Sequence, residues 1–114
     1  MNLDEENGVH CYAIYGEFDG VNFPALRQYI LDSVDILSFW NHLPGLFLIK
    51  TKIELNTFTY KIAPFFGGKF FIVMQVNPSN VNGVLPLPAW EWFRTPAPPG
   101  KVSGHLYPLP QLLS

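Results

Sequence analysis

The 114-residue chain has few charged residues and a single cysteine, and these shortages exclude several kinds of site and of protein. Only 14% of its residues are charged, whereas a typical globular protein carries about 25%. Because Cys11 stands alone, no disulfide within the chain and no thiolate metal site can form. We therefore expect a protein of a reducing compartment, the cytoplasm.

Long apolar runs and clusters of basic residues are missing as well. No uninterrupted apolar run approaches the ~20 residues of a membrane helix, and the first residues are acidic, unlike a secretory signal. The formal net charge is -2, and no basic cluster exceeds the pair Lys50 and Lys52. Strong nucleic-acid binders carry a basic patch, so we expect a soluble protein with no membrane contact and no strong nucleic-acid affinity.

Aromatic residues, in contrast, are abundant. The chain contains 10 Phe, 5 Tyr and 3 Trp, and aromatic side chains are enriched at protein interfaces. We expect a homodimer, or a dedicated protein partner, with some of these residues at the interface. The candidate interface residues lie around the expected second strand and in the C-terminal third: Trp40, His42, Trp90, Trp92, Phe93, Leu106 and Tyr107.

The chain divides into three parts. Residues 1–8 are polar and end in Gly8, which is typical of a loose acidic leader. Residues 9–93 form the expected domain. Residues 94–114 are rich in proline but too apolar for a free linker, so we expect this tail to dock on its own domain or on a partner. Its segment 102–107 could add one edge strand.

Hydrophobic periodicity predicts six elements within the domain. Residues 9–18 indicate a central strand buried on both faces, and residues 23–33 a helix. Residues 36–43 and 46–52 indicate two strands joined at Pro44-Gly45, the composition of a type II turn. A helix over residues 54–63, ended with the help of Pro64, precedes a strand over residues 69–76, which we expect to be central and covered because it is strongly apolar.

This order, β-α-β-β-α-β, predicts an α+β ferredoxin-like domain, in which an antiparallel sheet carries both helices on one face. The other face would be open. An exposed apolar face of this size usually receives a partner, a tail or a ligand.

The aromatic strand pattern resembles that of the SinR-family small proteins. These are similar to the CRISPR-associated dimeric ferredoxin-like endonuclease of spacer acquisition and to the VapD toxins, and the resemblance covers about residues 10–93. It implies a phage, plasmid or bacterial-defence setting. The residues that carry it are Tyr12-Ala13-Ile14-Tyr15, Phe39-Trp40-Asn41-His42-Leu43, Leu48-Ile49-Lys50-Thr51 and Ala89-Trp90.

The resemblance also implies a catalytic site. In that group an aspartate ends the first strand, and two protomers would hold one divalent metal, such as magnesium, between two carboxylates. The matching position here is Glu17, with Asp19 two residues later. The family's histidine stands one position away from His42, and a one-residue shift in a strand moves a side chain to the opposite face.

We expect a non-catalytic interaction or assembly protein, homodimeric and without a cofactor. One alternative is a magnesium-dependent endoribonuclease or endonuclease that uses Glu17 and Asp19 across a dimer axis. Another is a protein inhibitor of a defence enzyme. A nuclease would be expected to gather lysines around its carboxylates, and the candidates are Lys50, Lys52, Lys61 and Lys69.

Overall fold

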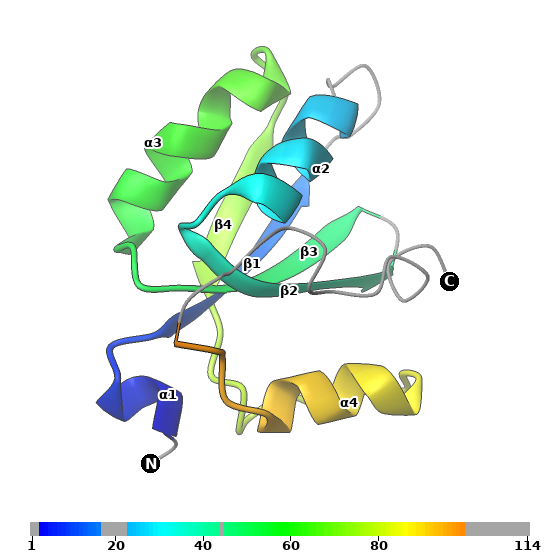
Figure 1. The fold of residues 1–114 in the computed structure, drawn as a ribbon. Coiled ribbons are helices and arrows are strands. Elements are labelled where there is room, and N and C mark those ends of the chain that lie inside the picture. Colours follow the sequence, from blue (N-terminus) through cyan, green and yellow to red (C-terminus); the bar gives the residue numbers. More distant parts are fainter. Residues whose placement is uncertain (1–2, 17–22, 44, 100–114) are drawn as a thin grey trace.

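A computed structural model describes residues 3–16, 23–43 and 45–99, which form one antiparallel sheet between two layers of helices (Figure 1). The elements in chain order are α1 (Leu3–Glu6), β1 (His10–Gly16), α2 (Phe23–Asp32), β2 (Ile36–Leu43), β3 (Leu46–Thr51), α3 (Leu55–Phe66), β4 (Phe71–Gln75) and α4 (Leu87–Arg94).

The sheet has four strands in the order β2-β3-β1-β4, and every neighbouring pair is antiparallel. The predicted α+β class is confirmed, and the arrangement is compatible with a ferredoxin-like fold. Helices α2 and α3 cover one face of the sheet, whereas α4 lies against the other (Figure 1). The expectation of an open second face is therefore corrected, because residues after β4 fold back to cover part of it.

Strand β1 lies inside the sheet, as its sequence predicts. Its residues Cys11 to Ile14 are all buried. Tyr12 and Ile14 face α2 and α3, while Cys11 and Ala13 belong to a second cluster on the α4 face. A strand that is covered on both faces has no solvent-exposed face, so polar residues do not alternate with apolar ones along it. This explains the nearly continuous apolar sequence of β1.

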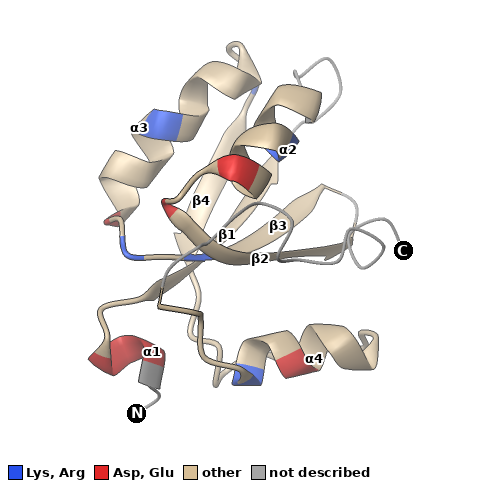
Figure 2. Cartoon of the chain, in the orientation of Figure 1, with Lys and Arg blue, Asp and Glu red and all other residues tan. Residues whose placement is uncertain are grey.

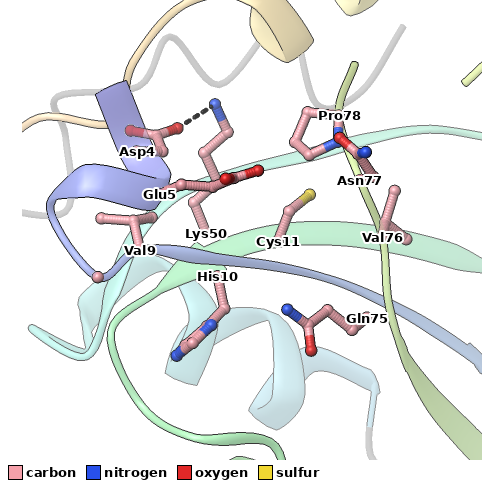
Figure 3. A pocket seen from close by; sticks show the side chains of 11 residues that line it. Asp4, Glu5, Val9, His10, Cys11, Lys50, Gln75, Val76, Asn77 and Pro78 are labelled. Atoms are coloured by element: carbon pink, nitrogen blue, oxygen red, sulfur yellow. Dashed lines mark ion pairs between the residues drawn. The ribbon is translucent and has the colours of Figure 1, made fainter. Parts of the chain in front are cut away.

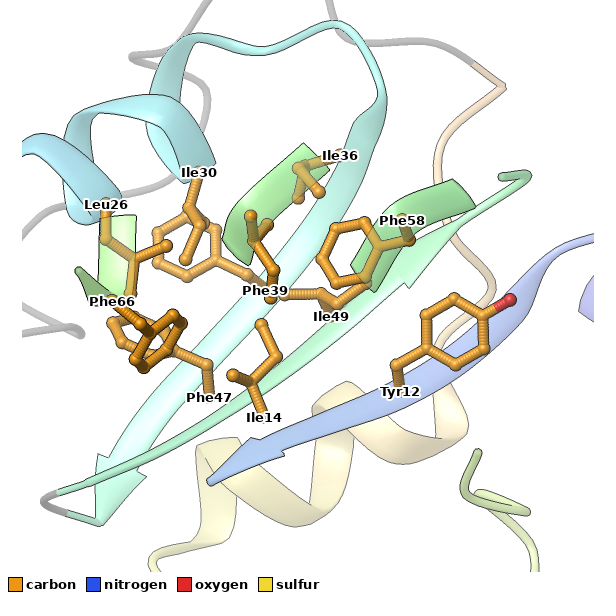
Figure 4. Close-up of a cluster of buried hydrophobic side chains, with 11 residues drawn as sticks. Tyr12, Ile14, Leu26, Ile30, Ile36, Phe39, Phe47, Ile49, Phe58 and Phe66 are labelled. Carbon is orange, nitrogen blue, oxygen red and sulfur yellow. The ribbon is translucent and has the colours of Figure 1, made fainter. Parts of the chain in front are cut away.

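The main core lies between the sheet and helices α2 and α3 (Figure 4). In α3, Phe58, Ile62 and Phe66 recur at four-residue spacing, so they share one face of the helix and are fully buried. The buried residues of this cluster are Tyr12, Ile14, Leu26, Ile30, Ile36, Phe39, Phe47, Ile49, Phe58, Ile62 and Phe66.

The predicted hairpin between β2 and β3 is confirmed. Leu43 pairs with Leu46, and Gly45 has φ 78°, the positive value that the second central residue of a type II turn requires. Pro44 lies outside the described residues.

Helix α3 continues past Pro64, so the prediction that this proline helps to end the helix near residue 63 is wrong. The helix ends at Phe66, and Gly67 adopts the left-handed conformation, φ 56°, that is typical of a helix C-cap. Pro64 removes only the hydrogen bond to the carbonyl of Tyr60. Since Pro64 and Tyr60 are both exposed, water can satisfy that carbonyl.

Strand β4 is at the edge of the sheet, not in its covered centre as predicted. Its sequence is strongly apolar, but an apolar run does not tell which neighbours a strand will have. Ile72 and Met74 are 52% and 42% exposed, because α4 does not extend over this side of the sheet (Figure 1).

The N-terminal residues also differ from the expected loose leader. Residues 3–6 form α1, and Asp4 is buried. At the other end, residues 95–97 contact Asp4 and Lys50, so both flanking segments pack on the expected domain. The tail from residue 100 onward lies outside the described residues. Among the described helices, none has the length and apolar character needed to cross a bilayer.

Candidate interaction surfaces

A buried ion pair connects α1 to β3. The Nζ atom of Lys50 lies 2.9 Å from Oδ2 of Asp4, and the two side chains are only 2% and 9% exposed (Figure 3). Lys50 Nζ also donates to the carbonyl oxygens of Thr95 at 2.7 Å and Trp92 at 3.3 Å. Three acceptors match the three N–H groups of an ammonium, so the buried charge is fully paired.

The same cluster holds the end of α4 in place. The second carboxylate oxygen of Asp4 accepts the backbone N–H of Ala97 at 2.8 Å, and Lys50 Nζ lies 4.8 Å from the centre of the Trp92 ring. A lysine is well suited to the carbonyls at a helix C-terminus, which lack partners within the helix. We call Asp4, Lys50, Trp92, Thr95 and Ala97 the Lys50 clamp.

A pocket of about 430 Å³ lies beside the clamp. Cys11 lines it, and burial raises the pKa of its thiol to about 12; Lys50 opposes this shift and Asp4 adds to it. The thiol is therefore protonated at neutral pH and is a poor nucleophile. His10 and Gln75 point away from the ion pair (Figure 3). Within the described ranges, no three His, Cys, Asp or Glu side chains are grouped so that they could hold a metal ion.

The candidate catalytic residues Glu17 and Asp19 lie outside the described residues. Strand β1 ends at Gly16, which pairs with Phe71 at the start of β4. Of the four candidate lysines, only Lys69 lies close to this end of the sheet in the chain.

The other three lysines lie elsewhere. Lys50 pairs with Cys11 at the opposite end of β1 and is held in the clamp. Lys52 follows β3 at that same end, and Lys61 of α3 pairs with Asp35 at 2.9 Å. The described basic residues are spread over the molecule (Figure 2), so the four candidate lysines do not lie together at one place.

The predicted interface aromatics pack against one another between the sheet and α4. Trp40 is buried, with its ring centre 5.9 Å from that of Phe93. Trp90 and Trp92 contact the same phenyl ring at 6.0 and 5.4 Å. His42 meets Trp40 edge-on at 5.2 Å, and burial lowers the pKa of its imidazole, which keeps it neutral at pH 7.

Leu106 and Tyr107, the other two candidate interface residues, lie outside the described residues. The candidate interface aromatics that are described thus contribute mainly to packing within the chain.

A hollow of about 330 Å³ opens between this aromatic layer and the segment after β4. We call it the α4 groove. Its described lining has no charged side chain and consists of Ala13, Trp40, Leu43, Leu46, Leu48, Val76, Val81, Asn82, Gly83, Val84, Leu85, Trp90 and Phe93.

An exposed apolar strip follows β4 on the same face of the sheet as α4. Tyr15 pairs with Ile72, and Ala13 with Met74, so these side chains point to the same side. Tyr15, Ile72 and Met74 are 57%, 52% and 42% exposed. We call these three residues the β4 strip.

The backbone edge of β4 beside this strip is free within the described part of the chain. The N–H of Val76 donates to the carbonyl of Cys11 at 2.8 Å. Since hydrogen-bonded pairs alternate along antiparallel strands, the backbone groups of Ile72 and Met74 also face β1. Those of Phe71, Val73 and Gln75 then point outward, where the sheet ends.

Sequence reasoning missed both the β4 strip and the Lys50 clamp. The sequence signal for an edge would have been a charge or a proline within β4, and Phe71–Gln75 has neither. Asp4 and Lys50 could not be recognised as a pair from the sequence, because they lie far apart in the chain.

Comparisons with protein-family models, with curated proteins and with solved structures gave no significant match. They leave the resemblance to the SinR-family group as a prediction.

Proposed function

We propose that this chain is a ferredoxin-like, non-catalytic assembly protein that forms a homodimer through the free edge of β4. The observation that carries the proposal is the combination of an unpaired backbone edge with the exposed β4 strip. Such an edge is a template for another strand, and natural proteins usually block it with a charge, a proline or a covering segment. The described part of β4 has none of these.

The strand arrangement supports the ferredoxin-like part of the proposal. The sequence of elements from β1 to β4 is β-α-β-β-α-β, with α2 and α3 on one face. Helix α4 is an addition on the other face, and it leaves the β4 side of the sheet available.

The geometry of β4 favours a second copy as the partner. Two antiparallel β4 strands related by a two-fold axis at Val73 would place Val73 opposite its counterpart and Ile72 opposite Met74 of the other copy. The outward backbone groups of Phe71, Val73 and Gln75 would then form the hydrogen bonds. On the α4 face, the two strips would join into one apolar surface across the axis.

Charge substitutions in the strip test this pairing. A variant with Ile72→Glu and Met74→Glu brings four carboxylates together across the axis and is expected to be monomeric by light scattering. A variant with Ile72→Lys and Met74→Lys is expected to be monomeric for the same reason. Mixed in equal amounts, the two variants should form a dimer, because opposite charges then face each other.

Val34→Glu is the matched control, since Val34 is an exposed apolar residue outside the sheet and its substitution should leave the dimer intact. A monomeric unsubstituted chain, or a dimer that persists in the double-glutamate variant, would overturn the edge pairing.

The non-catalytic part of the proposal is tested separately with labelled RNA and DNA in the presence of Mg²⁺. Cleavage that is lost in Glu17→Ala would establish a nuclease instead.

A further inference from the structure

We propose that the α4 groove binds residues 106–110 of the same chain, Leu-Tyr-Pro-Leu-Pro. This inference goes beyond the assembly proposed above, and it holds whether or not β4 pairs with a second copy. The proposed ligand of the groove is an uncharged, proline-rich segment.

The groove has the chemistry that recognises such a strand. Trp40, Trp90 and Phe93 supply aromatic walls, and proline-rich segments in the polyproline II conformation dock into aromatic-lined grooves. Because this conformation is already populated in free proline-rich chains, binding loses little conformational entropy. Neither the described groove lining nor residues 106–110 contain a charge, so no charged group would be buried without a partner.

Trp40 supplies a second indication. Its indole Nε1 is buried and has no acceptor among the described residues, although a buried indole N–H usually finds one. A polyproline strand has no internal hydrogen bonds, so all its carbonyls are available as acceptors. Since Nε1 is buried, a carbonyl would reach it only as the surrounding groups shift on binding.

The chain is long enough for the segment to fold back. The Lys50 clamp fixes Ala97 beside Lys50, and Leu46 in the groove lies about 13 Å along β3 from Lys50. Residues 98–106 can span up to ~30 Å when extended. The segment is therefore long enough to reach the groove of its own chain.

A spin label at the tail of the full chain tests the proposal. In Gln111→Cys, only the introduced thiol should be labelled, because Cys11 is buried and its thiol pKa is raised to about 12. We expect the label to broaden the NMR signals of the Trp40 and Trp90 indoles and of the amides of residues 81–85. Reduction of the label should restore these signals.

Two variants should abolish the broadening. Val81→Glu places a charge in the groove lining, and Tyr107→Ser with Leu109→Ser removes apolar side chains from the segment without touching the described layers. Val34→Glu, remote from the groove, should leave the broadening unchanged.

Unbroadened groove signals in the labelled chain would overturn the proposal, as would broadening that survives in the tail variant. A mixture of isotope-labelled chain without the spin label and spin-labelled chain without isotopes checks for exchange between copies. Broadening in that mixture would assign the segment to a second copy and would overturn docking within one chain.

Discussion

The Lys50 ammonium and the Asp4 carboxylate lie 2.9 Å apart in the interior, although one belongs to β3 and the other to α1. Through Thr95 and Ala97 the same two side chains also hold the segment after α4. The layer on the α4 face is thus attached to the sheet by a few directional polar contacts in addition to apolar packing.

We predict that Asp4→Ala lowers the free energy of unfolding by about 3–5 kcal/mol, because it leaves the Lys50 charge buried without its counter-ion. Urea unfolding followed by tryptophan fluorescence would measure the loss. Asp35→Ala is the matched control. It breaks an ion pair of the same length whose side chains are 42% and 30% exposed, so we expect little change.

The double variant Asp4→Leu with Lys50→Met should recover much of that stability, since replacing a buried ion pair with apolar side chains is often neutral. If Asp4→Ala were no more harmful than Asp35→Ala, the clamp would not contribute as described.

Gly16→Ala should loosen the pairing of β1 with β4. A Cβ atom on Gly16 would lie 2.6 Å from Cβ and 2.9 Å from Cα of Phe71, so the backbones must separate, at a cost of roughly 1–3 kcal/mol. Hydrogen exchange at the amides of Ile72 and Met74 should accelerate. Val34→Ala, at an exposed residue outside the sheet, is the control and should leave the exchange of these two amides unchanged.

Stability should fall at alkaline pH because of Cys11. Burial raises the pKa of its thiol from an ordinary value of 9.0 to about 12, so the folded chain keeps a proton that the unfolded chain releases. This contribution is fully present below about pH 9 and is lost as pH rises towards about 12. The pKa of Tyr12 is also raised, mainly by burial, and acts in the same direction.

Urea unfolding midpoints compared across that pH range, for the natural chain and for Cys11→Ala, would measure the thiol's part. We expect a shallower decline in Cys11→Ala. Equal slopes in both chains would show that the buried thiol is not the group responsible.

Truncating either of two aromatic residues on α3 should have very different effects on the free energy of unfolding. Phe58 is fully buried, with its ring centre 5.7 Å from that of Tyr12, so Phe58→Ala should cost about 3–5 kcal/mol. Tyr60 is 82% exposed on the same helix, and Tyr60→Ala should change stability by less than about 0.5 kcal/mol. Chemical unfolding of both variants is the measurement.

Elements whose signals are local could be predicted from the sequence. The hairpin follows from Pro44-Gly45, since Gly45 supplies the positive φ of the turn. The burial of β1 follows from its apolar run, which suits a strand covered on both faces. In each case the residues that decide the structure are neighbours in the chain.

Features that depend on distant partners could not be predicted. In the clamp, Lys50 contacts Thr95, 45 residues away, and Asp4 contacts Ala97, 93 residues away. Neither Lys50 nor Asp4 lies in a sequence motif that would predict these contacts. The edge position of β4 is set by the order in which the strands pair, which hydrophobicity does not encode. The same holds for the coverage of the α4 face, because Ala89 is buried only once α4 has folded back onto the sheet.

The clamp has a consequence for the order of events on the ribosome. Asp4 is synthesised 93 residues before Ala97, whereas β1 to β4 and the helices between them are complete by Gln75. In a sheet formed from β1 to β4 before α4 docks, Lys50 would have Asp4 as its partner but would lack the carbonyls of Trp92 and Thr95, and Trp40 would lack its cover from α4.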